Sequence, residues 1–293
     1  MNDYRENDSN AIFKPSLGFI ALCFLIGFAG FGYVLVTLPG LPDKPNPAAI
    51  EGGWKFALVA THVLTFVLIP LAMKVFYESL KRLNLQSGIF ASQLGLSFIM
   101  VAIASEIGWH VTQDWFYQNQ FTMLNFMFYF FLISAFALWA DAFVMEDNLG
   151  TRLINILFAI SLLAISILYP LGYENDENSA YKIPIYIALT LVFSVLTYRG
   201  YKILEDWKII LFPIFSVGIN LTFIFLLDKY GVPQDGVLPD PLYLNPLFHI
   251  LHDLGGTEAG VAIFTWLVYS KGKKMQNATG STTLGSGQLA SGR

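Results

Sequence analysis

The sequence predicts an all-α polytopic membrane protein with eight transmembrane helices in one bundle. Hydrophobic residues make up 55% of its 293 residues, charged residues make up only 13%, and the mean hydropathy is +0.56. A soluble domain is typically about a quarter charged. The small net charge of −4 gives no sign of a nucleic-acid partner. Most of the chain is therefore expected to lie in the bilayer.

Eight apolar stretches, each of about 20 residues, are long enough to cross a bilayer as helices. The linkers between them are short, and the two longest, 39–53 and 229–242, are rich in proline. The fifth to seventh stretches carry almost no ionisable groups and are interpreted as scaffold, whereas the second, third and eighth contain all four histidines. The predicted spans are Leu17–Leu38, Trp54–Phe76, Ile89–Val111, Phe121–Met145, Leu153–Tyr173, Ile183–Tyr201, Ile209–Asp228 and Tyr243–Tyr269.

Residues 1–275 are predicted to form a single transmembrane domain. Residues 276–293 are rich in glycine, serine and threonine and almost uncharged, which is typical of a flexible tail. The single cysteine, Cys23, lies in an apolar stretch, so disulfides within the chain and thiolate metal sites are excluded.

Charged residues in the loops predict which side of the membrane each loop occupies. Lysine and arginine follow the second, fourth, sixth and eighth spans, whereas the opposite loops are acidic or neutral. Because cytoplasmic loops carry an excess of these cations, both termini are predicted to be cytoplasmic and all four histidines to lie in the outer half of the membrane. The cations that give this pattern are Lys74, Lys81, Arg82, Arg152, Arg199, Lys202, Lys208, Lys271, Lys273 and Lys274.

The four histidines and nearby carboxylates predict a metal site. Glu106 and His110 are four residues apart and share a helix face, as do His249 and His252, which are three apart. His62, on the second span, lies at a similar depth. Imidazoles from several helices of a bundle are a common metal-ligand set, and an open position suits a catalytic zinc that activates water.

The predicted ligands are therefore His62, His110, His249 and His252, with Glu106 or Asp253 as the catalytic base or as a group that orients a ligand. The corresponding reaction is zinc-dependent hydrolysis of a lipid amide or ester that reaches the site from the bilayer.

Two other functions fit the same residues. The histidines could hold haem or non-haem iron in a membrane oxidoreductase or oxygenase, because transmembrane cytochromes place histidines on facing helices. Alternatively, the histidines could form a proton or ion relay with Asp253 and Glu258 in a transporter or receptor, because ionisable groups inside a membrane mark functional sites by default.

Three short segments resemble the superfamily of alkaline ceramidases and adiponectin/progestin receptors. Residues 248–255 resemble its last-helix histidine motif, 109–112 its early histidine, and 123–127 the segment that holds an aspartate. The resemblance implies a seven-helix membrane hydrolase with an intramembrane zinc. The chain departs from the motifs at Asn245, Asn125 and Glu106, where the superfamily carries histidine, aspartate and serine. It also has eight predicted spans rather than seven.

Overall fold

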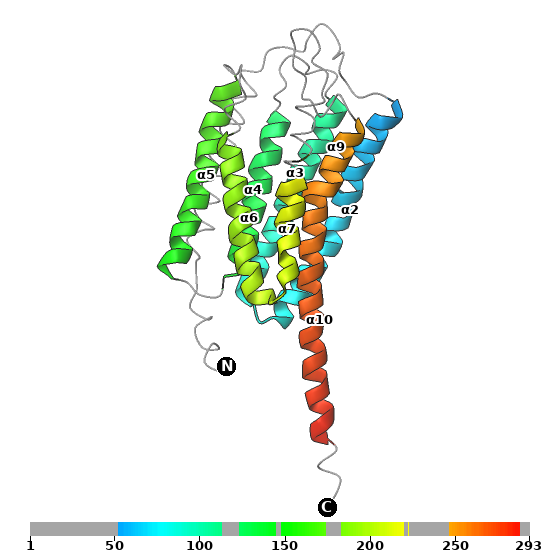
Figure 1. Ribbon diagram of the computed structural model, residues 1–293, viewed down its shortest axis with the longest axis vertical. Helices are drawn as coiled ribbons and strands as arrows, with labels where there is room; N and C mark the ends of the chain where they lie inside the picture. Colours follow the sequence, from blue (N-terminus) through cyan, green and yellow to red (C-terminus); the bar gives the residue numbers. More distant parts are fainter. Residues whose placement is uncertain are drawn as a thin grey trace, which may run out of the picture.

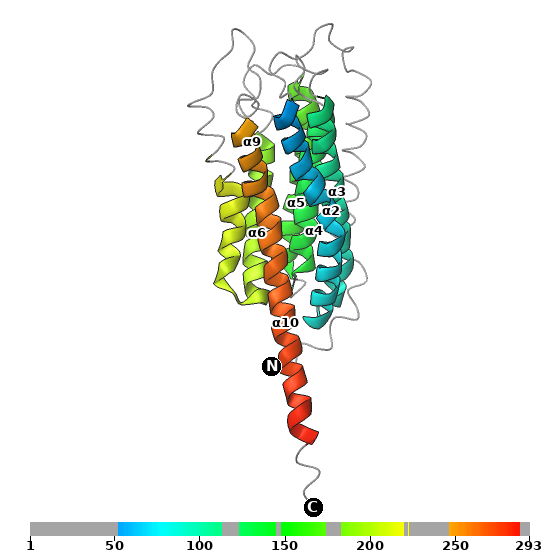
Figure 2. The same ribbon diagram turned by 90° about the vertical axis from the view of Figure 1, so that its right-hand side faces the viewer.

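The computed structural model describes residues 52–112, 123–144, 148–173, 183–219, 222 and 246–287. All regular structure in these residues is helical. The long helices run side by side along one axis, as the two views in Figures 1 and 2 show. The predicted all-α class is confirmed for this part of the chain.

Seven of the eight predicted spans correspond to helical segments in the described residues. The predicted first span, Leu17–Leu38, and the end of the seventh lie outside the described residues. The last two helical segments of the described part are each built from three consecutive elements. In chain order the elements are α2 Gly52–Arg82, α3 Gln86–Thr112, α4 Met123–Ala142, α5 Leu149–Tyr173, α6 Ile183–Leu204, η3 Trp207–Ile210 with α7 Leu211–Pro213 and η4 Ile214–Ile219, and α9 Pro246–Asp253 with η6 Leu254–Glu258 and α10 Ala259–Gly287.

The helices pack in a ring that closes on itself. α2 packs on α3, α3 on α4, α4 on α6, and α6 on α7; α10 then contacts α7 and returns to α2. α5 lies outside this ring against α4 and α6. The ring brings the first and last described helices together, so α2 and α9–α10 can build a site from residues that are about 200 positions apart in the sequence.

α4 is the most deeply buried of the described helices, because every residue from 130 to its end at 142 is buried. The indole of Trp139 packs against the rings of both Phe76 from α2 and Phe264 from α10, with ring-centroid distances of 4.9 and 5.5 Å, and these two rings lie 6.1 Å from each other. α3 approaches closely, since a side chain on Gly88 would overlap the carbonyl oxygen of Ala142. Small residues at such contacts let membrane helices pack backbone to backbone.

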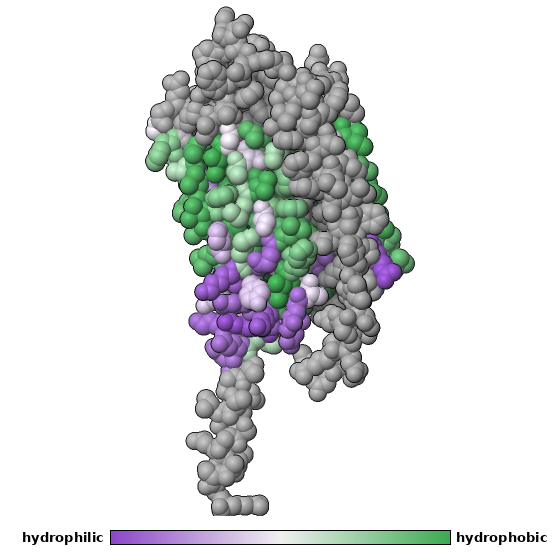
Figure 3. Space-filling view, turned by 180° about the vertical axis from the view of Figure 1, so that it is seen from behind, coloured by the Kyte–Doolittle hydropathy of each residue, from purple (hydrophilic) through white to green (hydrophobic). Residues whose placement is uncertain are grey.

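The outer surface of the bundle is apolar, as a lipid environment requires. Large hydrophobic side chains such as Phe56, Val67, Phe90 and Ile187 are more than half exposed. Figure 3 shows hydrophobic residues over the middle of one face and hydrophilic residues gathered at the end from which α10 emerges. In the described residues, α2, α3, α5 and α6 are long and apolar enough to cross a membrane. The polytopic membrane class is therefore supported.

α10 continues as a helix to Gly287, past the lower ends of the other helices. The helix therefore includes residues 276–287, which belong to the predicted tail. The division into a domain of residues 1–275 and a flexible tail of residues 276–293 stays a prediction.

Candidate functional site

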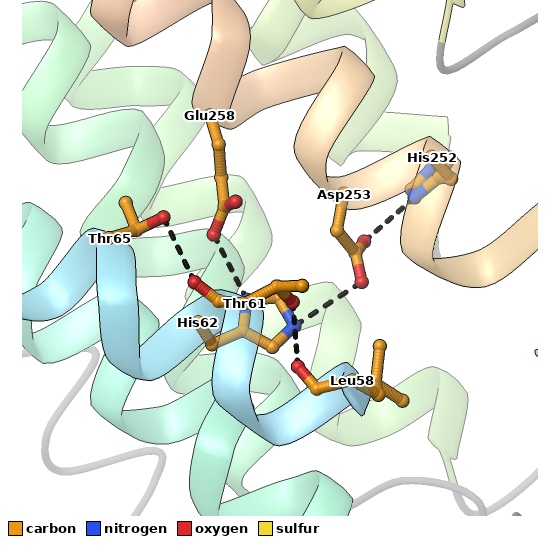
Figure 4. A network of polar contacts seen from close by, with 7 residues as sticks. All are labelled: Leu58, Thr61, His62, Thr65, His252, Asp253 and Glu258. Atoms are coloured by element: carbon orange, nitrogen blue, oxygen red, sulfur yellow. Dashed lines mark hydrogen bonds and ion pairs between the residues drawn. The ribbon is translucent and has the colours of Figure 1, made fainter. Parts of the chain in front are cut away.

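A buried histidine on α2 is held by two carboxylates of the last helical segment. His62 is 4% exposed. Its Nδ1 lies 3.1 Å from Oε1 of Glu258, and its Nε2 lies 3.2 Å from Oδ2 of Asp253. The other carboxylate oxygen of Asp253 lies 2.9 Å from Nδ1 of His252. Figure 4 shows the two carboxylates directed at the imidazole of His62 from the neighbouring helix.

The two carboxylates stand on either side of an irregularity in the last helical segment. α9 ends at Asp253, and the π-helical turn η6 then runs from Leu254 to Glu258. Within it, Gly256 leaves the helical region, with φ −96° and ψ −110°. Such π-turns inside helices occur frequently at functional sites. His62 therefore bridges the kink, with one ring nitrogen on each side of it.

The spacing of the two carboxylates depends on the π-turn. Asp253 and Glu258 are five residues apart, and in a regular α-helix only residues three or four apart face the same neighbour. A π-turn bonds residue i to residue i+5 and so brings this pair toward one face. Consequently the kink is what lets both carboxylates reach His62.

The protonation of His62 decides how many of these contacts are favourable. A neutral imidazole has one N–H donor and one acceptor, whereas the imidazolium has two donors. Favourable contact with both carboxylates therefore arises in two ways. Either the ring is doubly protonated and both carboxylates are ionised, or the ring is neutral and one carboxylate carries a proton. When the ring is neutral, one nitrogen lone pair faces a carboxylate oxygen, and that contact becomes repulsive.

A third carboxylate, that of Glu106 on α3, is 6% exposed and interacts electrostatically with His62. The residues His62, Glu106, His252, Asp253 and Glu258 are called the His62 cluster below. Ionised groups in a low-dielectric interior cost several kcal/mol each unless they are compensated. Since the cluster has three carboxylates and two imidazoles, its charge balance depends on bound protons.

The structure brings together four of the six predicted site residues. His62, His252 and Asp253 are in contact through the distances above, and Glu106 belongs to the same cluster. The backbones of His110 and His249 lie in α3 and α9, but their side chains lie outside the described part of the structure. The predicted zinc site and the alternative haem or iron site therefore stay predictions. Among the residues whose side chains are described, no three His, Cys, Asp or Glu are arranged as a metal site.

Glu258 is the cluster member that the sequence predicted least directly. It lies five residues after Asp253, so an α-helical pattern places it on another face. The Gly255-Gly256 pair between them is the available signal, because two glycines weaken a regular helix.

A second π-helical turn faces the first. η4, in the preceding helical rod, packs directly against η6. Immediately after η6, a side chain on Gly260 would overlap the hydroxyl of Ser216 in η4. The first turn of α10 therefore approaches η4 so closely that a side chain at position 260 would force Ser216 to shift. The turn that contains the kink and the turn packed against it therefore both depart from regular α-helix.

Another buried polar group lies in the half of the bundle opposite the His62 cluster. The guanidinium of Arg199 on α6 donates a hydrogen bond of 2.7 Å to the carbonyl oxygen of Ala140 and interacts electrostatically with Asp141. Asn155 on α5 donates to Asp141 over 3.4 Å. Asp141, Asn155 and Arg199 are called the Arg199 cluster below. Arg199, which counted as a loop cation in the sequence, is in fact only 7% exposed.

The sequence pattern of a protein family described as seven transmembrane receptor matches residues 54–274. The match begins in α2 and ends in α10, and so contains all seven helical segments of the described part. No curated protein and no solved structure matches the chain. These comparisons do not support the resemblance to alkaline ceramidases and adiponectin/progestin receptors.

Proposed function

Since the chain belongs to the seven transmembrane receptor family, we propose that it is a non-enzymatic membrane receptor that responds to protons at the His62 cluster. The family match supports the relay alternative of the sequence analysis better than hydrolysis of a lipid amide or ester. The observation that carries the proposal is the bridge from one imidazole to two carboxylates, Asp253 and Glu258, across a kink.

In the proposed mechanism, the doubly protonated ring of His62 donates to Asp253 and Glu258 and holds α9 and η6 against α2. When the ring loses a proton, it can donate to only one of them. The other carboxylate then faces a lone pair and is released, so that one side of the kink can move. The switch is the loss of one proton from the His62 ring. The segment that changes between two arrangements in response is the kink at Gly256.

The last helix can carry this change through the bundle. α10 starts directly after Glu258 and runs without a break to Gly287. Its residues Phe264, Leu267 and Val268 are at most 1% exposed, and Phe264 stacks on Trp139 of α4. A shift of its first turn is therefore transmitted to the aromatic core and to the opposite end. The loop charges support an orientation in which the His62 cluster lies in the outer half of the membrane.

The proposal is tested by measuring the position of α9 as a function of pH. Spin labels are placed at Leu251→Cys on α9 and Ile183→Cys on α6, which are 40% and 56% exposed, after Cys23→Ser. The distance between the labels is recorded in lipid nanodiscs from about pH 5 to about pH 11. We expect the distance distribution to shift with pH, and His62→Gln to abolish the shift.

Thr61→Val is the matched control, because Thr61 neighbours His62 on α2 but its hydroxyl donates only within its own helix, to the Leu58 carbonyl at 2.7 Å. This variant is expected to keep the pH-dependent shift. A distribution that does not change with pH, or an equal shift in His62→Gln, would contradict the proposed receptor mechanism. Metal analysis of the same purified protein tests the zinc and iron predictions.

A further inference from the structure

Three lysines near the end of the bundle opposite the His62 cluster lie over exposed aromatic rings. The ammonium of Lys202 is 5.7 Å from the ring centroid of Tyr198 on α6, and that of Lys208 in η3 is 5.5 Å from the ring of Trp266. On α10, Lys273 lies 6.0 Å from the ring of Tyr269. The three elements contact one another. These six residues are called the lysine–aromatic face.

The rings of this face are exposed although they are large and apolar. Tyr198 is 64% exposed, Trp266 50% and Tyr269 41%. Cation–π contact holds each ammonium near its ring. Tyrosine and tryptophan gather at the level of lipid headgroups, where one end is apolar and the other is wet. Each ring and its lysine therefore present an apolar body to acyl chains and a positive charge to headgroups.

The excess of positive charge extends around this end of the bundle. Lys81 and Arg82 form the last turn of α2, and Lys271 and Lys274 flank Lys273 in α10. Two carboxylates among the described residues of this region are engaged locally: Glu205 pairs with Lys271 at 2.7 Å, and Glu78 with Arg82 at 3.4 Å. Asp206 accepts a hydrogen bond from the backbone N–H of Lys208. The three lysines of the face have aromatic rings, not carboxylates, as their described partners.

The apolar part of this surface favours a lipid over a soluble acidic protein. Trp207 in η3 is 69% exposed and Ile210 is 48% exposed, and both lie in the short turn that connects α6 to α7. Exposed apolar side chains beside lysines are stable where a membrane covers them. Clusters of cations next to a transmembrane helix attract anionic lipids, with about 1 kcal/mol for each lysine or arginine near the membrane surface.

We propose that the lysine–aromatic face binds the headgroup phosphates of anionic phospholipids in the leaflet that it contacts. Lys202, Lys208 and Lys273 supply the charge, and Tyr198, Trp266 and Tyr269 set the depth at which that charge lies. This inference does not depend on the receptor mechanism, because it uses none of the residues of the His62 cluster.

The test measures binding of fluorescent phosphatidylglycerol and fluorescent phosphatidylcholine to the purified full-length protein in detergent micelles. We expect the wild type to prefer phosphatidylglycerol, with an affinity that falls as salt is added. Lys202→Gln/Lys208→Gln/Lys273→Gln is expected to lose this preference, by on the order of fivefold for each lysine and about a hundredfold for the three. Lys202→Arg/Lys208→Arg/Lys273→Arg keeps the charge and is expected to retain the preference. Thermal unfolding of each variant checks that it folds.

A second triple variant tests whether the lipid preference comes from the lysine–aromatic face or from the general positive charge at this end of the bundle. Lys74→Gln/Lys81→Gln/Arg152→Gln removes the same number of charges elsewhere and is expected to lower the preference by less than tenfold. An equal loss in both triple variants would assign the effect to diffuse charge and overturn the proposal. So would equal binding of the two lipids by the wild type, full displacement by millimolar inorganic phosphate, or selective binding of polyglutamate instead of phosphatidylglycerol.

Discussion

The His62 cluster and the Arg199 cluster are both buried and polar, but they differ in chemistry and in the helices that hold them. The His62 cluster joins α2 to a kinked last segment through an imidazole that can gain or lose a proton. The Arg199 cluster joins the regular helices α4 and α6 through a guanidinium that stays charged. A titratable base at a kink can act as a switch, whereas a permanent cation between regular helices acts as a structural tie.

The largest expected effect on stability is at the Arg199 cluster. Arg199→Met removes the hydrogen bond to Ala140 and leaves Asp141 buried without its cation, so we expect a loss of about 3–5 kcal/mol. Arg199→Met/Asp141→Leu replaces both charges with apolar groups and should recover most of this loss. Thermal unfolding in detergent measures both variants. Wild-type stability in Arg199→Met would contradict the role of the Arg199 cluster as a structural tie. Loss of the pH-dependent movement of α9 in a folded variant of this cluster would show that it also takes part in the switch.

His62→Leu is expected to destabilise the protein less but to remove the pH response. The carboxylates of Asp253 and Glu258 then lose the imidazole that lies between them, and we expect this to cost about 2 kcal/mol. His62→Leu/Glu258→Gln removes one of these charges and should regain stability without regaining the response. A pH response in either variant, recorded with the same spin labels, would show that another group is the switch.

Gly260→Ala tests whether the contact between the first turn of α10 and the π-turn η4 is tight. The added methyl group would overlap the hydroxyl of Ser216, so we expect a loss of about 1–2 kcal/mol. Gly260→Ala/Ser216→Gly should relieve it. Gly88→Ala is the matched change at a contact between two regular helices, α3 and α4. Its added methyl group would overlap the backbone oxygen of Ala142, so no second substitution can relieve the overlap by removing a side chain. Unfolding measurements that show no recovery in the double variant would place the strain elsewhere.

The smallest expected effect is at the exposed pair of Lys271 and Glu205. The hydrogen bond from the Lys271 ammonium, together with its positive charge, lowers the pKa of Glu205 below its ordinary value of 4.5. A lowered pKa in the folded state adds stability that is present above pH 4.5 and is lost as the pH falls through the lower, folded value. Glu205→Gln should therefore reduce stability slightly near neutral pH, with no difference at strongly acidic pH. A difference that grows on acidification would contradict this assignment.

The sequence predicted most of the helical architecture, because spans of about 20 apolar residues are required by the thickness of the bilayer. It also predicted that all four histidines would gather with Glu106 and Asp253 near one depth of the membrane. Of these six residues, His62, Glu106, His252 and Asp253 lie together in the His62 cluster, whereas the positions of the His110 and His249 side chains stay predictions. It did not predict the π-turn, because a short change of helical period leaves the apolar composition unchanged. The role of Glu258 depends on that turn and could not be derived from α-helical spacing.

Arg199 was misplaced for a different reason. Near the end of a span, an arginine in a loop and an arginine directed into the bundle look alike in the sequence. Only packing shows that its guanidinium reaches Ala140 and Asp141.

The family match begins at residue 54, so the predicted first span, Leu17–Leu38, precedes the part of the chain that the family shares.

The most direct test of the central claim combines two measurements in one pH titration. Nitrogen-15 NMR of the histidine rings, with the His62 signal assigned from its loss in His62→Gln, reports how many protons the ring carries. Spin-label distances on the same preparation report the position of α9. We expect His62 to carry two ring protons when α9 is held against α2, and the distance to change at the pH where one proton is lost. A change in distance while His62 keeps both protons, or a singly protonated ring in the held state, would contradict it.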